Sequence, residues 1–211
     1  TWDLLPGQTI TFDAPNNEPS VFNTEEGPGI IVIAKSSGPN AFGPANNARI
    51  DGFTITGGDS GGGIFASGYA RFLEISNNKV VSNSGFYSGG IRVGHPILAG
   101  GTDGPAYGGY TNARNDNVYI HHNHVTQNGS VDETAAGGGI AICTGADNYR
   151  VTQNYVCGNF SQGSGGGIGP AGVSTCRLSA GRSACSRSRA RMCPFRTWTS
   201  LRRAARTSTS H

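Results

Sequence analysis

Four of the five histidines are candidates for metal binding, because imidazole side chains that gather in one place are common metal ligands. They are His95, His121, His122 and His124. A repeat described below places His121 and His124 on opposite sides of a predicted corner at Asn123, with His121 pointing outward. Their side chains would then project from different faces, while His122 fits either face. We therefore predict no metal site and expect solvated surface histidines.

The segment from Gly58 to Gly62 reads Gly-Asp-Ser-Gly-Gly and matches the nucleophile motif of trypsin-like serine proteases. That mechanism needs a histidine to take the serine proton and an aspartate to orient the histidine, and in that family both precede the serine. No histidine precedes His95 in this sequence. The glycines also belong to a unit that recurs three more times without Asp-Ser. We therefore predict that Ser60 is not a protease nucleophile.

The composition favours a folded, glycine-rich β protein. Glycine accounts for 34 of the 211 residues and charged residues for only 14%, whereas average proteins have about 7% and 25%. The hydrophobic fraction of 36% is too high for a disordered polar chain. The longest apolar run covers residues 30–34, far short of the roughly 20 residues of a membrane span. We therefore expect one folded domain and no membrane span.

Charge and composition change abruptly near residue 175. All 13 acidic residues lie in residues 1–175, which carry a net charge of −6, whereas residues 176–211 hold nine arginines and no acid. Two interpretations remain open for this tail: a shifted reading frame of a GC-rich gene, and a genuine disordered basic tail. We do not expect nucleic-acid binding, although arginine-rich segments can order on nucleic acids. Since three of the five cysteines lie in the tail, no disulfide framework follows from the sequence.

Two sequence units alternate along the chain and determine the predicted fold. The first consists of small residues, mostly glycine, followed by isoleucine, and its isoleucines are 27, 49 and 28 residues apart: Ile64, Ile91, Ile140 and Ile168. The second unit, apolar-x-x-Asn-x-Val-x-x-Asn, begins at Ile75, Ile120 and Val151. One copy of about 25 to 30 residues cannot bury its apolar face alone, so the copies must stack and share one core.

Each copy contains short β-type runs that are separated by single glycines or asparagines. Alternation within the runs places the four isoleucines in one interior row and the valines of the second unit in another. Asparagine tolerates the left-handed backbone conformation that a sharp corner requires. We therefore predict that the first asparagines of the second unit adopt this conformation and hydrogen-bond from copy to copy. They are Asn78, Asn123 and Asn154.

Together the two units resemble the right-handed parallel β-helix repeat proteins, the architecture of the pectate-lyase-like superfamily. The resemblance covers residues 28 to 172, and its most specific element is Asn-x-Val-x-x-Asn followed by Gly-Gly-Gly-Ile. It implies an all-β fold: a right-handed parallel β-helix, or β-solenoid, at residues 28–175. We expect an incomplete first coil at 1–27 and an unstructured or frame-shifted tail at 176–211. Since the family's coils usually continue for many more turns, we also expect a truncated solenoid.

The resemblance implies that sugar lies along the outward side of the sheet formed by the Gly-Gly-Gly-Ile strands. That side contains Phe65 and Arg92, and an insertion between residues 95 and 115 adds two tyrosines. Exposed aromatic rings there would stack on sugar rings, although single surface aromatics are also ordinary. The candidate ligand-binding residues are Phe65, Arg92, Tyr107 and Tyr110. The candidate catalytic residues are Arg92, His95, Asp132 and Glu133.

Neither catalytic arrangement implied by the resemblance is evident in this sequence. Glycosidases need two positioned carboxyl groups about 5 to 9.5 Å apart, and lyases of this fold have a calcium site of acidic residues beside a basic proton acceptor. Asp132 and Glu133 are neighbours in a predicted loop, and Arg92 lacks acidic residues at the equivalent positions of adjacent coils. We therefore expect no cofactor, with calcium only in the lyase alternative.

The leading hypothesis is a secreted or surface-displayed bacterial β-helix module that acts as a rigid scaffold and binds polysaccharide. Low charge, abundant polar residues and the lack of a recognisable catalytic set favour it. The alternative is a polysaccharide lyase or glycoside hydrolase with part of its site in missing coils. Carboxyl groups that cluster within hydrogen-bond reach of Arg92 or His95 would favour the enzyme.

Overall fold

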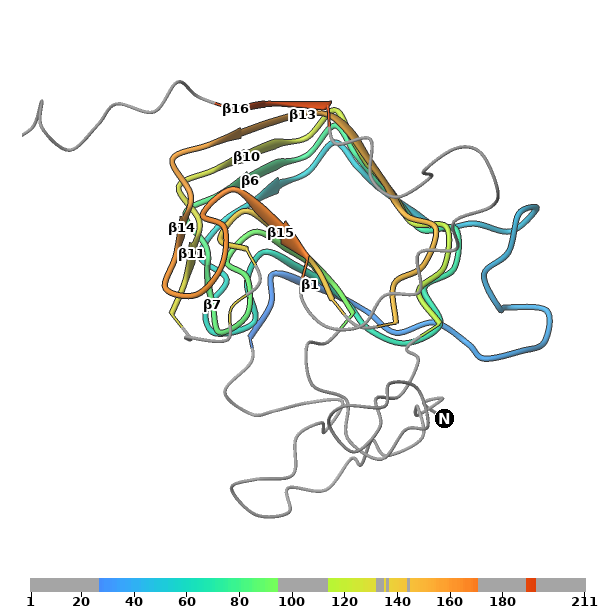
Figure 1. Ribbon diagram of the computed structural model, residues 1–211. Helices are drawn as coiled ribbons and strands as arrows, with labels where there is room; N and C mark the ends of the chain where they lie inside the picture. Colours follow the sequence, from blue (N-terminus) through green and yellow to red (C-terminus); the bar gives the residue numbers. More distant parts are fainter. Residues whose placement is uncertain are drawn as a thin grey trace, which may run out of the picture.

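The computed structural model describes residues 27–94, 114–131, 135, 137–143 and 145–170, together with the backbone of residues 189–192. Within these ranges the chain forms β-strands and no helix. The ladders between its strands are parallel, and one of the sheets curls strongly around the interior (Figure 1). The prediction of an all-β fold is confirmed for this part of the chain.

The described strands form three sheets. The first contains β1, β4, β8, β12 and β15 in this order: Ile30–Val32, Ile64–Ala66, Ile91–Val93, Ile140–Ile142 and Ile168–Pro170. The curled sheet contains β2, β5, β9, β13, β10, β6 and β3: Arg49–Asp51, Glu74–Ser76, Tyr119–His121, Arg150–Cys157, His124–Thr126, Lys79–Val81 and Thr54–Ile55. The third contains β14, β11 and β7: Phe160–Ser161, Gly129–Ser130 and Ser84–Gly85.

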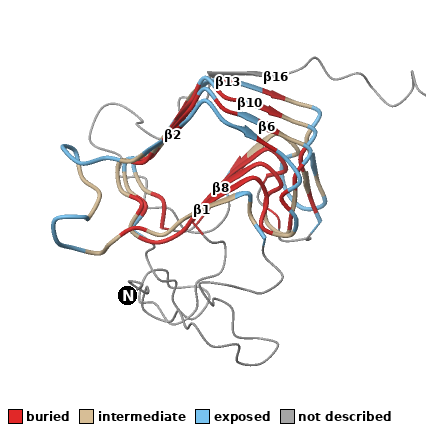
Figure 2. Cartoon of the chain, turned by 180° about the vertical axis from the view of Figure 1, so that it is seen from behind, coloured by how far each residue is buried: buried red, intermediate tan, exposed pale blue. Residues whose placement is uncertain are grey.

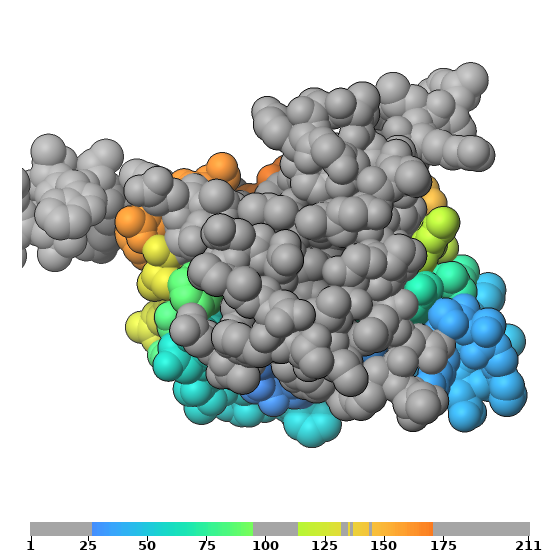
Figure 3. Space-filling view, turned by 90° about the horizontal axis from the view of Figure 1, so that it is seen from below, coloured from blue at the N-terminus to red at the C-terminus, as the bar shows by residue number. Residues whose placement is uncertain are grey.

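The chain visits these sheets in a fixed order, and one passage through all three is called a circuit below. Strands β4 to β7 form one circuit, β8 to β11 the next, and β12 to β14 the one after that. In Figure 3 the blue and cyan segments lie in the lower part of the view, and the orange segments lie toward its upper edge. The circuits are in register, so residues at equivalent positions of the repeat lie side by side.

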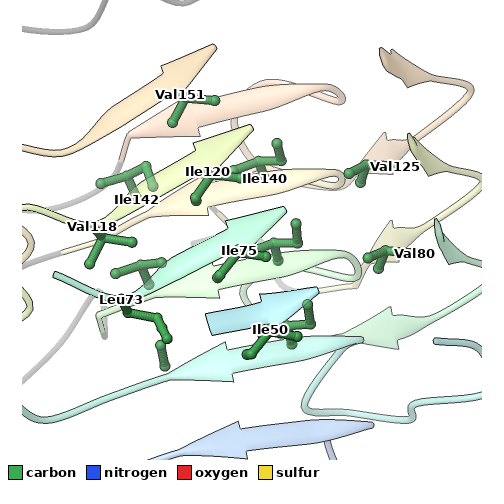
Figure 4. Packing of buried hydrophobic residues seen from close by; sticks show 14 of the residues in the cluster. Ile50, Leu73, Ile75, Val80, Val118, Ile120, Val125, Ile140, Ile142 and Val151 are labelled. Carbon is green, nitrogen blue, oxygen red and sulfur yellow. The ribbon is translucent and has the colours of Figure 1, made fainter. Parts of the chain in front are cut away.

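The interior of the stack consists of rows of apolar side chains that run from circuit to circuit. Ile64, Ile91 and Ile140 are fully buried, and each pairs in register with the next. Val80, Val125 and Val156 form a second buried row. A third row comprises Ile50, Ile75, Ile120 and Val151 (Figure 4). The two predicted rows are confirmed, with Ile168 only partly buried in the outer strand β15.

Burial along the circuits explains the low charge of these segments. All three residues of β8 are buried, and buried residues also dominate its neighbours in the first sheet (Figure 2). Full burial of one isoleucine or valine side chain contributes about 1.5 to 3 kcal/mol. Because every row repeats this gain at each level, the circuits stabilise one another although no circuit has a core of its own.

Two ladders of asparagine side chains connect the corners of successive circuits. The side-chain Nδ2 of Asn78 donates to Oδ1 of Asn123 at 3.0 Å, and that of Asn123 donates to Oδ1 of Asn154 at 3.0 Å. A second ladder joins Asn83, Asn128 and Asn159 at 2.9 Å per step. The predicted hydrogen bonding from copy to copy is therefore confirmed.

The predicted backbone conformation of these asparagines is wrong by one residue. Positive φ angles occur at the preceding positions, Asn77 at 55°, His122 at 54° and Gln153 at 54°. The left-handed residue turns the chain, and the asparagine that follows points its amide inward along the stack. There the side-chain Nδ2 of Asn123 also donates to the carbonyl oxygens of Ile75 and His121.

Glycine at the position before the repeated isoleucine is required by close approach between circuits. A Cβ atom on Gly90 would lie 2.1 Å from the carbonyl oxygen of Gly139, and one on Gly139 would lie 2.6 Å from that of Gly167. Neither Gly90 nor Gly139 has a positive φ angle. Neighbouring backbone occupies the space of the missing side chain, which explains why glycine recurs at this position of the repeat.

The arginine-rich tail contributes one described strand. Residues Arg189–Met192 form β16, which pairs in parallel with β13, with Met192 in register with Val156. We expected no strand in this tail, so the expectation is wrong for these four residues. The outer edge of a parallel sheet offers backbone donors and acceptors to any extended segment, whatever its side-chain pattern.

Several of the expected segments lie outside the described residues. Residues 1–26, most of the expected first coil, and the remainder of residues 176–211 lie outside the described residues. Among the residues that the structure does describe, no helix has the length and apolar character needed to cross a membrane.

Candidate functional site

The predicted sugar-binding residues Phe65 and Arg92 are in-register neighbours on β4 and β8. Both are buried, with exposed fractions of 4% and 1%. The guanidinium carbon of Arg92 lies 3.6 Å from the centre of the Phe65 ring and 5.3 Å from that of Tyr87. The expectation that Phe65 is exposed is therefore wrong, because a cation–π contact occupies the face of its ring.

The same face of the first sheet holds Cys143, a free cysteine that is buried with Ala141. Burial raises the pKa of the Cys143 thiol to about 12, and the positive charge of Arg92 opposes this rise only in part. Since the thiolate is the reactive form, this cysteine is unsuited to nucleophilic or metal chemistry at neutral pH.

Five of the predicted site residues lie outside the described residues: His95, Tyr107, Tyr110, Asp132 and Glu133. Their roles stay predictions. Near the Gly-Asp-Ser-Gly-Gly segment, the backbone nitrogen of Ser60 donates to the carboxylate of Asp59 at 2.9 Å. That hydrogen bond belongs to a local turn of the backbone. It does not involve the Ser60 hydroxyl group, so it does not make Asp59 a proton acceptor for that hydroxyl.

A group of polar side chains lies on the outward side of the curled sheet, across β2, β5, β9 and β13. We call it the outer face. The central residue of each strand triplet points into the core, so the flanking residues point outward. Two in-register rows result: Arg49, Glu74, Tyr119 and Arg150, followed by Asp51, Ser76, His121 and Thr152.

A chain of short contacts on the outer face joins Glu74, His121 and His122, and is called the histidine chain below. Nε2 of His121 lies 2.6 Å from Oε1 of Glu74, and its Nδ1 lies 2.7 Å from Nδ1 of His122. His121 is only 8% exposed, whereas His122 is exposed at the corner of the circuit. One buried imidazole thus links a half-buried carboxylate to an imidazole in contact with solvent.

A second network surrounds Asp51 at the edge of the outer face. Its Oδ1 accepts hydrogen bonds from Asn77 at 2.7 Å, from Ser76 at 2.8 Å and from Arg49 at 3.0 Å. The hydrogen bonds from Asn77 and Ser76, together with the nearby charge of Arg49, hold the pKa of Asp51 below its ordinary value. Arg49 also approaches Oε1 of Glu74 at 3.6 Å, so both carboxylates of this face have cationic neighbours.

Serine, histidine and glutamate stand side by side here without the geometry of a catalytic triad. Ser76 is in register with His121, but its hydroxyl donates to Asp51 and accepts from Nε of Arg49 at 2.9 Å. Both ring nitrogens of His121 are engaged by Glu74 and His122. No nitrogen of His121 is left to take a proton from Ser76, so the serine is not activated as a nucleophile.

Aromatic and cationic groups stack along the outer face. The rings of Tyr119 and His121 are parallel within 27° and 4.0 Å apart, and the guanidinium of Arg150 lies 4.3 Å from the centre of the Tyr119 ring. The hydroxyl of Thr152 donates to that of Tyr119 at 3.1 Å. Tyr119 is thereby held in one orientation by two flat neighbouring groups and a hydrogen bond to its hydroxyl group.

A second stacked pair lies just past the Asn123 corner. The rings of His124 and Tyr155 are 4.6 Å apart and parallel within 17°, on adjacent strands of the curled sheet. Tyr155 is 40% exposed, and His124 and the in-register Lys79 are exposed too. Tyr119 and His121 precede the Asn123 corner and this pair follows it, and the two stacked groups on either side of the corner are together called the strip of flat side chains.

The predicted separation of the histidines is confirmed, but their predicted solvation is wrong for His121. His124 pairs with Lys79 and Tyr155, as the repeat alignment indicated, and makes no contact with the histidine chain. His121 is buried because Glu74, Tyr119 and His122 cover its ring. Within the described part of the chain, no group of three or more His, Cys, Asp or Glu residues is arranged to hold a metal ion.

Glu74 and Tyr119 are among the residues of this site that the sequence reasoning missed. The alignment of the second repeat unit already placed Ile75 beside Ile120, and hence Glu74 beside Tyr119 and Ser76 beside His121. Reading the outward positions of that alignment would have found the outer face, although not the hydrogen bonds within it. The chain matches no protein-family model, no curated protein and no solved structure.

Proposed function

We propose that residues 28–170 are part of a right-handed parallel β-helix that serves as a rigid extracellular or cell-surface scaffold and binds polysaccharide along its side. Parallel in-register circuits, continuous interior rows and two asparagine ladders support the β-helix. Such a stack is stiff because every side-chain row is fixed on both sides by its neighbours. We further propose, as the sequence suggested, a bacterial origin.

The polysaccharide is proposed to bind on the strip of flat side chains, rather than on the buried face of the first sheet. The stacked, exposed pair of Tyr155 and His124 carries this proposal. The carbon–hydrogen face of a sugar ring packs on the electron-rich face of an aromatic ring, while its hydroxyl groups need donors and acceptors at the rim. Lys79 and Arg150 supply donors, since neither forms an ion pair within the described residues.

The proposal is tested by affinity electrophoresis of the purified chain in gels that contain a neutral glucan, a xylan or a polygalacturonate. At least one polymer is expected to retard the chain, and Tyr155→Ala is expected to weaken this retardation roughly three- to tenfold. Phe160→Ala is the matched control, because Phe160 lies in the same circuit and is 63% exposed, but sits on the third sheet. Retardation by none of the polymers, or equal loss in both variants, would contradict the proposal.

A further inference from the structure

We infer that the histidine chain makes Nε2 of His122 a general base that accepts a proton from an O–H group on a bound ligand. The inference starts from the donors and acceptors of three side chains. An ionised carboxylate only accepts hydrogen bonds, so the 2.6 Å contact with Glu74 places a proton on Nε2 of His121. In the neutral imidazole the other nitrogen, Nδ1, then carries a lone pair.

The contact between the two imidazoles fixes the tautomer of His122 in turn. Nδ1 of His121 and Nδ1 of His122 are 2.7 Å apart, so one of them must hold a proton. Since Nδ1 of His121 is the acceptor, Nδ1 of His122 is the donor, and its Nε2 carries the lone pair. Within the described residues nothing hydrogen-bonds to Nε2 of His122, and the side chain is exposed. The proton-accepting end of the histidine chain therefore faces solvent.

The charges around the chain favour this order of protons. Arg49 approaches Glu74 at 3.6 Å and places a positive charge beside its carboxylate, while Asp51 accepts hydrogen bonds from three donors of its own. On the other side Tyr119 stacks on His121, and Arg150 lies over Tyr119 rather than over the imidazoles. When His122 takes a proton, the hydrogen bond to His121 and the negative charge of Glu74 stabilise the resulting positive charge.

The ligand class follows from the position of His122 beside the proposed polysaccharide strip, and this step rests on the proposed function. A sugar hydroxyl donates its hydrogen bond to Nε2 of His122. In the transfer, the O–H bond breaks, an N–H bond forms on Nε2, and the electron pair stays on the sugar oxygen. Glu74 and His121 do not touch the ligand; they are positioning residues that hold His122 in the reactive tautomer.

The test uses diethyl pyrocarbonate, which acylates the unprotonated nitrogen of an imidazole and needs no polysaccharide. Nε2 of His122 attacks a carbonyl carbon, the bond to the ethyl carbonate leaving group breaks, and the Nδ1 proton passes to His121 or solvent. Peptide mass spectrometry at pH 7 should show His122 modified about tenfold faster than His124. His124 is a matched internal control, because it is an exposed histidine of the same corner without a histidine–carboxylate chain.

Two variants test the positioning role. Glu74→Gln and His121→Phe are each expected to slow modification of His122 to the rate of His124, and the phenylalanine keeps a ring stacked on Tyr119. Asp51→Asn removes a carboxylate of the same face outside the chain and should leave the rate unchanged. Long-range proton–nitrogen NMR should show Nδ1 of His122 protonated in the wild type, and this signature should be lost in Glu74→Gln.

The outcomes separate this inference from the proposed function. Equal rates for His122 and His124, or a proton on Nε2 of His122 with a doubly protonated His121, would overturn the general-base assignment even where polysaccharide binds. Fast modification of His122 that depends on Glu74 would support it even where no polysaccharide retards the chain, and the hydroxyl donor would then not be a sugar.

Discussion

The carboxyl group of Asp116 shows how a single residue can oppose the fold that contains it. Desolvation raises the pKa of Asp116, the neighbouring carboxylate of Asp147 adds to this rise, and Arg71 and Arg114 reduce it. An acid whose pKa is higher in the folded than in the unfolded state loses its proton more easily on unfolding. Ionisation of Asp116 therefore lowers the free energy of unfolding as the pH rises above its ordinary pKa of 3.8.

We predict that Asp116→Asn is more stable than the wild type at pH 7, and that the difference disappears near pH 3, where both side chains are neutral. Urea unfolding at pH 3, 5 and 7 measures this. Asp51→Asn provides a control of opposite sign. Because the pKa of Asp51 is lowered, its ionised form stabilises the fold above its ordinary pKa, and that contribution is lost as the pH falls. The prediction is contradicted if Asp116→Asn is less stable than the wild type at pH 7 while the two are equally stable at pH 3.

At the scale of strands and corners, the separation between circuits is set by backbone contacts as much as by side chains. Gly90 lies against the carbonyl of Gly139, and the isoleucine that follows each of these glycines fills the core. The asparagine ladders repeat at the same spacing and join the corner of each circuit to the next. A change that pushes two circuits apart therefore disturbs core, glycines and ladders together.

We predict that Gly90→Ala destabilises the protein by roughly 1 to 3 kcal/mol, because its Cβ would lie 2.1 Å from the carbonyl oxygen of Gly139. Gly129→Ala, in the same circuit, is the matched control: no atom lies within 4 Å of its added Cβ, and its φ angle is not positive. That variant should stay within about 0.5 kcal/mol of the wild type. Urea unfolding of both variants measures their free energies of unfolding. Equal values for Gly90→Ala and Gly129→Ala would show that the circuits can separate without penalty.

The repeat made these elements predictable, whereas the contacts on their outward sides depend on geometry that no repeat encodes. Ile91 and Asn123 recur at fixed spacing, and the structure stacks both as expected. The left-handed residue of each corner escaped prediction because its side chain varies, from Asn77 to His122. Outward residues also vary, so whether Phe65 is covered is decided by the packing of Arg92 against its ring.

The histidine chain shows the same limit within the candidate site. Sequence alignment brings Glu74 and His121 onto neighbouring strands, but it cannot show which nitrogen of the imidazole meets the carboxylate. That detail depends on side-chain rotamers. It is also the detail from which the protonation of His122 follows.

At the scale of the whole molecule, the described circuits form a stack in which each level contacts only its neighbours. In the first sheet β8 lies between β4 and β12, whereas β1 and β15 are its outermost strands. A stack of this kind opens from its ends, because an outer strand has a neighbour on one side only. The proposed scaffold role depends on how firmly the middle of the stack is held.

Four chemically matched amide protons report on this property. Ile30, Ile64, Ile91 and Ile140 each follow a glycine. Each donates its backbone N–H to a carbonyl oxygen of the next circuit, at 2.8 Å for Ile91 and at 2.9 Å for the other three. Because the preceding residue and the hydrogen-bond length are nearly the same, differences in their exchange rates reflect position in the stack rather than local chemistry.

We predict that the amides of Ile64 and Ile91 exchange at least about tenfold more slowly than those of Ile30 and Ile140. The first two hydrogen bonds join inner strands, from β4 to β8 and from β8 to β12, whereas the other two involve the outermost strands β1 and β15. Hydrogen exchange followed by NMR at neutral pH measures all four in one experiment. One common exchange rate for the four amides would mean that the circuits open together as a single cooperative unit. Slower exchange at Ile30 or Ile140 would mean that the ends of the stack are more stable than its middle.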